Sequence, residues 1–242
     1  MTHDLFSAIG SHGFLVAAVT TVWLTFVAQA AGTVGGLILA PLRMSSRRAP
    51  RAIVSAYLLV FRGTPELLQL IAWYAVLPLA GVNLNLVEVA IIGLGANEAA
   101  RMAEIIRAGF QAVEPGQRDA ARVVGLSRGQ TLRYVLLPQA ARTIIAALGN
   151  EVNIMFKTTS LVSVIGITEL LRQGQLVAET ARNPLGTYLA ALIYYLVLTT
   201  IWGVFQGLLS RSAGSRSGRP SWIRAWWEAL SGGLQGGSQW SR

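Results

Sequence analysis

Apolar residues along this chain fall into long runs, each of a length that can cross a lipid bilayer as a helix. A spanning helix needs about 20 mostly apolar residues, whereas a water-soluble domain interrupts such runs with polar positions at helical or strand period. The predicted spans are residues 14–40, 52–79 with an interruption at 62–65, a third that starts near 87 and turns charged from 98, then 143–167 and 184–209. A mixed loop at 168–183 is predicted between the last two. The pattern therefore predicts an all-α integral membrane protein with five transmembrane helices.

Arginines between the spans predict which way the chain crosses the membrane. They gather in residues 43–51, in residues 107–142 and in the tail after 210, whereas the connection 80–86 has none. Cytoplasmic loops carry an excess of basic residues. We therefore expect a multi-pass protein of the bacterial cytoplasmic (inner) membrane, with a periplasmic N-terminus and a cytoplasmic C-terminus.

Three regions follow from this arrangement. Residues 1–13 are predicted to be a periplasmic N-terminus, and residues 14–210 a transmembrane domain whose cytoplasmic loop occupies about 113–142. The tail, 211–242, is rich in Ser, Gly and Arg and is expected in the cytoplasm. Trp222 and Trp226 lie one helical turn apart, which suits an interfacial helix; a disordered tail is the alternative.

Composition excludes several kinds of chemistry. The chain has no cysteine, and both histidines, His3 and His12, precede the first span, which excludes thiolate sites and histidine chemistry within the core. A P-loop needs a Gly-Lys pair, but the single lysine, Lys157, follows Phe156. We therefore expect a non-catalytic chain that binds no metal or cofactor, so that any ATP it depends on is hydrolysed by another polypeptide.

The polar loop between the third and fourth spans begins with a predicted helix at residues 117–124. Asp119 is expected in its first turn, where the helix dipole favours an anion. Ala120 and Ala121 would give this helix a flat face of small side chains. Gly125 then fits the position just past the helix end, which is usually left-handed.

A second helix is predicted directly after this turn. Ser127 and Gln130 have the spacing of a capping box, and Leu132, Val135 and Leu136 recur at helical spacing. Pro138 is expected to kink the chain where it re-enters the membrane. A short exposed helix suits a groove on a partner; the alternatives are an ordinary loop and, remotely because of the flanking spans, a DNA-binding helix–turn–helix.

The spacing of this loop resembles the EAA motif of permeases in binding-protein-dependent ABC importers. The match consists of Asp119, Ala120 and Ala121, then Gly125, then VLLP at 135–138. Asp119 stands where the family has Glu, and Val135 where it usually has Ile. The resemblance implies a coupling helix that receives the motion of an ATPase, with Leu126, Ser127 and Pro138 as further coupling residues.

Further segments resemble the polar amino-acid permeases of histidine, glutamine or arginine type within this group. They are FRGTP at 61–65, AEIIR at 103–107, GLSR at 125–128, LPQA at 137–140, LGNE at 148–151 and KTTSLVSVIG at 157–166. The chain departs from the pattern with Arg101 in place of Tyr, Glu66 in place of Leu and Thr158 in place of Asp. These departures concern the identity of the substrate and not the family.

The resemblance covers roughly residues 15–209 and implies a type I (MetI-like) importer fold. It also implies the partners: a dimer of ATP-binding cassette ATPases that carries the ATP and Mg, a second permease subunit of the same or a homologous chain, and an extracytoplasmic amino-acid-binding protein. Membrane lipid surrounds such a subunit, and nucleic acid has no part in its function.

Ionisable residues within the spans are candidates for the substrate pathway, since they are costly in a membrane unless they face a cavity or a partner. Arg62 and Glu66 are four residues apart and can pair with each other, which competes with a role for Arg62 and Thr64 in substrate contact. Glu98, Arg101, Glu104 and Arg107 form a charge ladder in steps of three, of which Glu98 and Arg101 lie deep enough to line a pathway.

A polar cluster in the fourth span offers a second set of candidates. Glu151 and Lys157, with Thr159 and Ser160 nearby, suit recognition of the α-amino and α-carboxylate groups of an amino acid; a structural contact between Lys157 and Asn153 is the alternative. The acidic residues favour a cationic amino acid, whereas Arg101 opposes one.

These observations predict the permease subunit of an ATP-driven importer for a polar amino acid or a close derivative such as an opine. An ATP-independent secondary transporter or channel is the alternative, although no repeated halves are visible. A membrane enzyme would need catalytic residues that this composition lacks.

Overall fold

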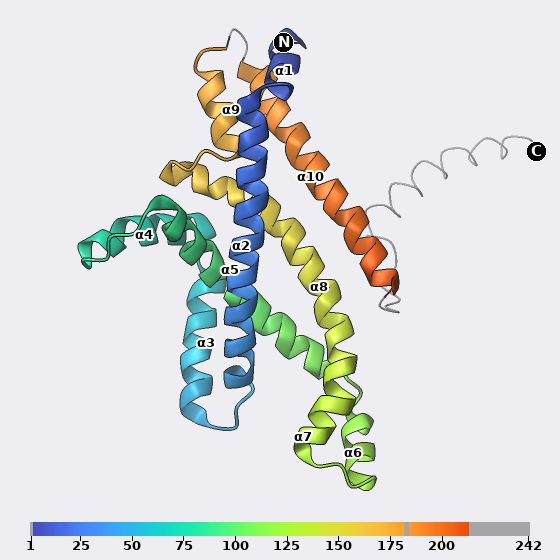
Figure 1. The fold of residues 1–242 in the computed structure, drawn as a ribbon. Helices are drawn as coiled ribbons and strands as arrows, with labels where there is room; N and C mark the ends of the chain where they lie inside the picture. The colour runs from blue at the N-terminus through green and yellow to red at the C-terminus, as the bar shows by residue number, and fades with distance from the viewer. Residues whose placement is uncertain (1, 182–183, 213–242) are drawn as a thin grey trace, which may run out of the picture.

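The computed structural model describes residues 2–181 and 184–212, which form an elongated, all-helical molecule with no strand among them (Figure 1). The elements are α1 (Thr2–Ile9), α2 (His12–Arg43), α3 (Arg48–Gly63), α4 (Glu66–Leu79), α5 (Leu86–Gln111), α6 (Pro115–Val123), α7 (Arg128–Gln130), a π-helical segment (Thr131–Leu136), α8 (Leu137–Thr158), a 3₁₀ helix (Thr159–Ile165), α9 (Leu170–Ala178) and α10 (Pro184–Ser212). Apart from the end of α10, the predicted tail lies outside the described residues.

Within the described residues, two helices are long and apolar enough to cross a bilayer alone: α2, and α10 over Pro184–Leu208. They confirm the helices predicted at 14–40 and 184–209. A third candidate is the segment Arg128–Ile165 with α9, bent by 48° at the break between them. The predicted second span is two helices, and its break at residues 64–65 lies where the interruption was expected.

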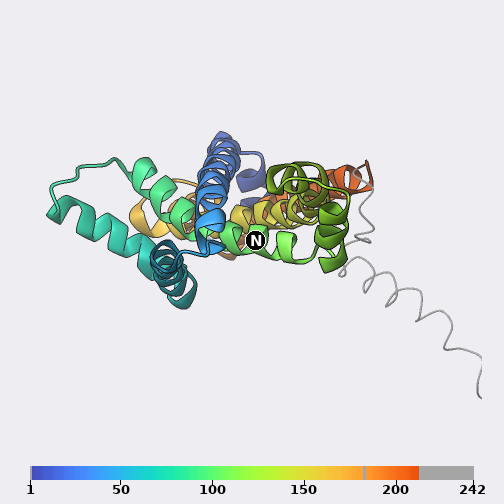
Figure 2. The same ribbon diagram turned by 90° about the horizontal axis from the view of Figure 1, so that it is seen from below.

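Pro65 divides the second predicted span into α3 and α4, because proline disfavours helical backbone at the residue before it, here the extended Thr64. The side chain of Gln69 compensates for the break, since its Nε2 donates to the backbone oxygens of Phe61 at 3.1 Å and Thr64 at 3.0 Å. Beyond the break α4 turns away from α3, as seen from below and from the side (Figures 1 and 2).

The region after the fourth predicted span differs from the expectation of a loop, because it contains α9. Glu169 accounts for this helix: its carboxylate accepts the backbone N–H groups of Leu171 and Arg172, both at 2.9 Å, which caps the first turn. The hydroxyl of Tyr195 in α10 donates to the same carboxylate. This shared acceptor joins the start of α9 to α10.

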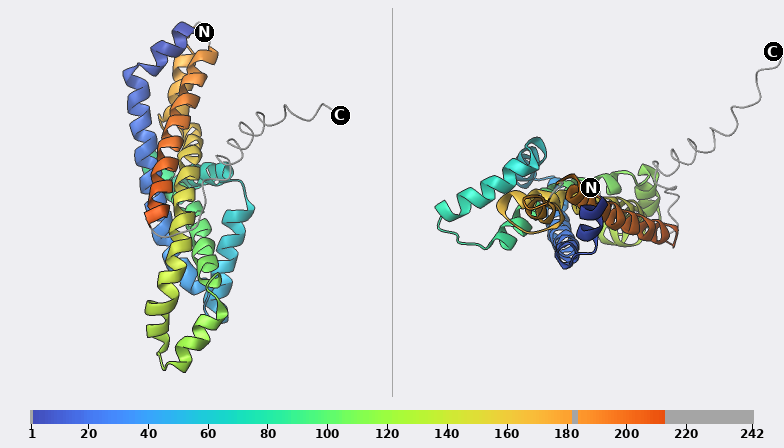
Figure 3. Two further views of the ribbon diagram at one scale, coloured as in Figure 1. Left: turned by 90° about the vertical axis from the view of Figure 1, so that its right-hand side faces the viewer. Right: turned by 90° about the horizontal axis from the view of Figure 1, so that it is seen from above.

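The two ends of the molecule carry different segments. The N-terminus and α9 lie at one end, while the α2–α3 connection and the α6–α7 loop lie at the other (Figures 1 and 3). The arginine-containing segments 43–51 and 107–142 thus share an end of the molecule, as the sequence predicted. This arrangement positions the candidate sites described below.

Helices α2 and α5 pack closely because small residues line their interface. Gly32, Gly35 and Gly36 of α2 face Glu98, Ala99 and Met102 of α5, and Gly95 of α5 faces Ala31. A Cβ atom on Gly36 would lie 2.9 Å from the carbonyl carbon of Met102 and 3.0 Å from the amide nitrogen of Ala103. Any larger residue at this position must therefore separate the two backbones.

Substituting Gly36 by alanine is expected to lower the stability of the protein by about 1–3 kcal/mol, the usual cost of overpacking. Gly207→Ala in α10 is the matched control, since a Cβ there meets nothing within 4 Å and alanine favours a helix interior by about 1 kcal/mol. Thermal unfolding in detergent should therefore move the two midpoints in opposite directions. Equal midpoints would contradict close packing of α2 on α5.

Candidate functional site

The loop between α5 and α8, which we call the α6 loop, forms the helix–turn–helix that the sequence predicts. Its first helix, α6, begins at Pro115 rather than 117, because proline is pre-organised for the first helical position. The expectation that Asp119 lies in the first turn is therefore wrong. Asp119 is exposed, and its carboxylate lies 3.5 Å from the guanidinium of Arg122, an exposed pair that contributes little to stability.

The turn after α6 confirms the prediction for Gly125, whose φ of 84° is left-handed. The backbone N–H of Gly125 donates to the oxygen of Arg122 and that of Leu126 to the oxygen of Ala121, both at 3.0 Å, which is a Schellman motif. The predicted capping box is also present: Ser127 Oγ accepts the Gln130 N–H at 3.3 Å, and Gln130 Oε1 accepts the Ser127 N–H at 2.9 Å.

The second helix runs without interruption from α7 into α8 but includes a π-helical turn at Thr131–Leu136. Pro138 lacks a backbone N–H, and the backbone N–H of Leu137 donates to Leu132 rather than to the residue four earlier. The expected kink is thus a π-helical turn. It also changes the expected apolar face, because Leu136 is buried whereas Leu132 is 48% exposed.

The two alanines of α6 do not form one exposed face. Ala121 is buried, while Ala120 is exposed. Only one of the two alanines predicted for the exposed face is therefore exposed. The residues at the tip are Val123 and Val124, which are 88% and 78% exposed. Sequence reasoning missed both valines, although two β-branched residues directly before the helix-ending glycine are the available signal. The loop therefore presents an apolar tip beside charged Asp119.

A second candidate site lies where Arg101 of α5 meets three carboxylates. Its guanidinium pairs with Glu66 at the start of α4, with Glu98 at 2.9 Å and with Glu151 of α8 at 3.2 Å. Gln29 of α2 donates to the other oxygen of Glu98 at 2.7 Å. Four helices thus converge on one charged cluster, which we call the Arg101 cluster: Gln29, Glu66, Glu98, Arg101 and Glu151.

Ion pairs with α5 correct one expectation from the sequence and confirm another. Arg62 does not pair with Glu66; its guanidinium lies 3.6 Å from Glu104 instead. The ladder along α5 is confirmed as the pairs Glu98–Arg101 and Glu104–Arg107, the latter at 2.8 Å.

Charge in the Arg101 cluster is unbalanced, because three carboxylates surround one guanidinium. Glu98 has no exposed surface and Glu151 is largely buried. The side-chain oxygen of Gln29 is buried without a hydrogen-bond partner, and Glu151 Oε2 makes only its ion pair with Arg101 Nε at 3.2 Å. Such groups are costly unless something compensates them. The cluster can therefore accept further hydrogen-bond donors or positive charge.

The other predicted pathway residues lie apart from the Arg101 cluster. Lys157 is exposed on this chain rather than buried, and no ion pair joins it to Glu151 within the described residues. The hydroxyls of Thr64, Thr159 and Ser160 donate to backbone oxygens of their own helical segments, at 2.8, 2.8 and 2.7 Å. Sequence reasoning did not include Gln29 or Glu66 in this site, because their partners are distant in sequence.

The chain matches the family model described as binding-protein-dependent transport system inner membrane component over residues 32–214. That segment includes both the α6 loop and nearly all of the Arg101 cluster.

The chain belongs to this family.

Relatives within the family are permeases of amino-acid transport systems. The chain is 40% identical over 209 residues to the arginine transport system permease protein ArgU of Corynebacterium glutamicum, an alignment that covers 81% of this chain and 66% of ArgU. It is 34% identical over 193 residues to the glutamine transport system permease protein GlnP of Escherichia coli K12, covering 79% of this chain and 88% of GlnP.

Solved structures show the same fold. A crystal structure of an amino acid ABC transporter with histidines matches with a TM-score of 0.79 and 38% identity, covering 83% of this chain and 94% of that one. The MetNI methionine ABC transporter in an inward-facing conformation matches with a TM-score of 0.68 and 20% identity, covering 83% and 95%. The mostly helical MetI-like permease fold is therefore confirmed, as is the inner membrane location of this family member.

Proposed function

We propose that this chain couples ATP hydrolysis on a separate subunit to alternating access, and so imports a polar amino acid or a close derivative. The observation that carries the proposal is the α6 loop, a helix closed by a Schellman turn, with an apolar tip at one end of a membrane-spanning fold. Family membership favours an ABC importer over the alternative of a secondary transporter or channel. The chain is proposed to be non-catalytic and to bind no cofactor.

The α6 loop is proposed to dock into a groove of an ATP-binding cassette ATPase that holds ATP and Mg. Asp119, Ala120, Val123 and Val124 are the exposed residues that would enter the groove, while the turn at Gly125 fixes the direction of the second helix. When the ATPase dimer closes, motion of α6 would pass through α8 to the Arg101 cluster. A second permease subunit and an extracytoplasmic binding protein complete the proposed importer.

The proposed topology has five spans, formed by α2, by α3 with α4, by α5, by the segment Arg128–Ile165 with α9, and by α10. The N-terminus is proposed to be periplasmic and the end of α10 cytoplasmic. The common position of segments 43–51 and 107–142 at one end of the molecule supports this orientation, because both are basic.

The substrate is proposed to be a cationic amino acid. From the sequence alone, the positive charge of Arg101 argues against a cationic substrate. In the structure, Glu98 and Glu66 compensate that charge within the chain. Glu151 is a third carboxylate on the same guanidinium, 3.2 Å from Arg101 Nε, so the Arg101 cluster keeps excess negative charge that suits an ammonium or guanidinium group. An arginine permease among the relatives supports the same class. Lys157 is the proposed partner of the substrate carboxylate.

Uptake of radiolabelled arginine into proteoliposomes tests this function. The vesicles would contain the chain, its ATPase and its binding protein. We expect uptake that requires hydrolysable ATP, and a fall of at least tenfold in Glu151→Gln and Lys157→Met, because each removes a charge that the substrate needs. Glu179→Gln is the control, since it removes an exposed carboxylate at the end of α9.

Two results would count against the proposal. Arginine uptake that persists without the ATPase would favour a secondary transporter. Unaltered kinetics in both Glu151→Gln and Lys157→Met, at normal assembly, would remove these residues from the pathway while leaving ATP coupling intact.

A further inference from the structure

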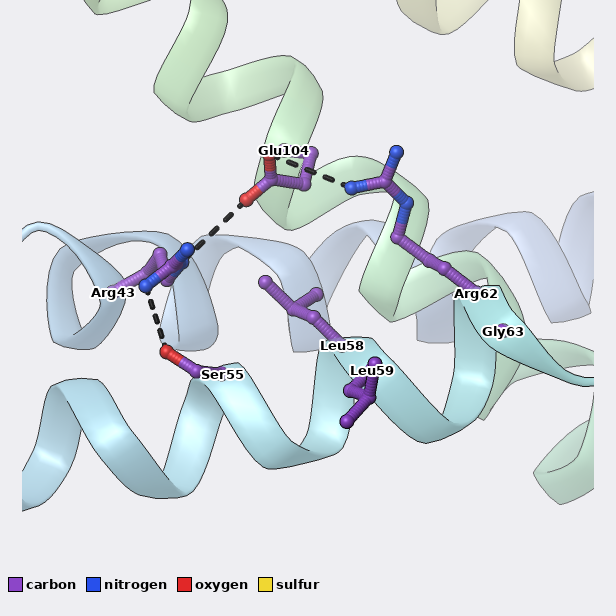
Figure 4. A pocket seen from close by; sticks show the side chains of 7 residues that line it. All are labelled: Arg43, Ser55, Leu58, Leu59, Arg62, Gly63 and Glu104. Atoms are coloured by element: carbon purple, nitrogen blue, oxygen red, sulfur yellow. Dashed lines mark hydrogen bonds and ion pairs between the residues drawn. The ribbon is translucent and has the colours of Figure 1, made fainter.

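A pocket on the side of the molecule is separate from both sites described above. It lies between the end of α2, the length of α3 and the second half of α5, and has a volume of about 360 Å³. Its polar walls are Arg43, Ser55, Arg62 and Glu104, and its floor is formed by Leu58 and Leu59 of α3 (Figure 4). This volume is within the range of about 300–1,000 Å³ that ligand pockets occupy.

Positive charge is in excess around this pocket. Glu104 is the acidic residue in its lining, and that carboxylate already binds Arg107 at 2.8 Å outside the pocket. Arg43 and Arg62 lie farther from the same carboxylate, at 3.7 and 3.6 Å. Three guanidinium groups thus share one carboxylate, and the local formal charge is +2. An anion that carries one or two negative charges would balance it.

Hydrogen-bond donors in the pocket are also incompletely used. Arg43 donates from Nη1 to the hydroxyl of Ser55 at 2.7 Å, while its buried Nε makes no hydrogen bond and faces Glu104 at 3.7 Å. Figure 4 shows Arg43 and Arg62 on opposite sides of Glu104, both above the surface of α3. Arginine presents its donors in a planar fork that matches phosphate oxygens. The arrangement therefore suits one phosphate that contacts both guanidinium groups beside Glu104.

The floor of the pocket indicates what kind of phosphate it accepts. Leu59 is 75% exposed, and Ile53 and Val60 of the same helix are exposed as well. An acyl chain can lie along this apolar surface while the headgroup stays between the arginines. Basic pockets between transmembrane helices are known to hold anionic lipid headgroups, whereas a soluble phosphate has no use for the apolar surface.

We infer that the pocket between α2, α3 and α5 binds the phosphate headgroup of an anionic phospholipid through Arg43 and Arg62. The bound lipid would tie α3 to α2 and α5 in the half of the molecule that also carries the α6 loop (Figure 1). The proposed orientation places the pocket in the cytoplasmic leaflet; the binding site itself does not depend on that orientation or on transport.

Native mass spectrometry of the full chain released from detergent tests this inference. Wild-type protein should retain dioleoylphosphatidylglycerol at least tenfold more than dioleoylphosphatidylcholine. The double variant Arg43→Gln/Arg62→Gln should lose this preference, while Arg43→Lys/Arg62→Lys should keep a part of it. Arg51→Gln is the matched control, because it removes an exposed arginine of α3 that does not line the pocket. Thermal unfolding of each variant confirms that it is folded.

Four outcomes would overturn the inference. They are unchanged lipid retention in a folded double variant, an equal loss in Arg51→Gln, displacement of phosphatidylglycerol by millimolar inorganic phosphate, and lipid bound to the monomer but absent from a dimer of the chain. An equal loss in Arg51→Gln would indicate diffuse attraction to the basic surface. Displacement by inorganic phosphate would indicate a site for free phosphate. Lipid absent from the dimer would indicate a pocket covered by a second copy.

Discussion

The double substitution Asp119→Lys with Gly125→Trp is expected to reduce substrate-stimulated ATP hydrolysis by at least tenfold in the reconstituted importer. Asp119 is exposed and makes one weak contact within the described residues, at 3.5 Å to Arg122. A Cβ atom on Gly125 would meet nothing within 4 Å. Neither position is packed against the rest of the described chain, so loss beyond the cost of the left-handed backbone at Gly125 is expected to arise where α6 contacts the ATPase.

Gly125→Ala separates this effect from backbone strain. Any side chain at Gly125 must adopt its left-handed backbone, which costs about 1–2 kcal/mol. Alanine incurs that cost without adding bulk, so most hydrolysis should survive in Gly125→Ala. ATP hydrolysis and uptake measured on the same vesicles give the comparison. Wild-type rates in the double variant, or an equal loss in Gly125→Ala, would show that the surface of α6 is not the docking surface.

Replacing Arg101 by methionine is expected to destabilise the protein by about 3–5 kcal/mol, the usual cost of removing one partner of a buried ion pair. Glu98 would remain without exposed surface and without its cation, while Glu66 and Glu151 would lose theirs. The midpoint of thermal unfolding in detergent, measured by a thiol-independent fluorescence assay, should fall by several degrees.

Arg107→Met serves as the control for this prediction. Arg107 makes the same type of pair with a glutamate three residues earlier, but at the more exposed end of α5. This pair is partly buried, but Arg43 and Arg62 remain 3.7 and 3.6 Å from Glu104 when Arg107 is removed, so the effect should be smaller than that of Arg101→Met. Adding Glu98→Gln to Arg101→Met should recover part of the stability, because the amide still accepts from Gln29. Equal midpoints for Arg101→Met and Arg107→Met would mean that the Arg101 cluster does not hold the helices together.

Local signals in the sequence predicted the helices that depend on them. The apolar runs gave α2 and α10, the FRGTP segment gave the break before α4, and Gly125 with Ser127 gave the turn of the α6 loop. These features are determined by neighbouring residues: a proline, a left-handed glycine, a capping box. Such signals can be read from a single chain.

Features that depend on distant residues could not be read in this way. Arg62 and Glu66 have helical spacing, but the break at Pro65 separates them, so that each pairs with α5 instead. Helix α9 depends on a cap at Glu169 that also binds Tyr195. The π-helical turn rotates Leu132 outward, and burial of Ala121 depends on how α6 packs on that turn. Contacts between distant segments determine these ion pairs and this burial, and no local pattern had predicted α9.

Protection of a single cysteine tests the proposed docking most directly. The chain has no cysteine of its own, so Val123→Cys places a unique thiol at the tip of the α6 loop. Val82→Cys, exposed in the connection between α4 and α5, is the control. Labelling by a membrane-impermeant maleimide would be measured in detergent, with and without the purified ATPase.

We predict that the ATPase slows labelling of Val123→Cys by at least tenfold and leaves labelling of Val82→Cys unchanged. Equal labelling rates at Val123→Cys with and without bound ATPase would contradict the account of this loop as the coupling interface.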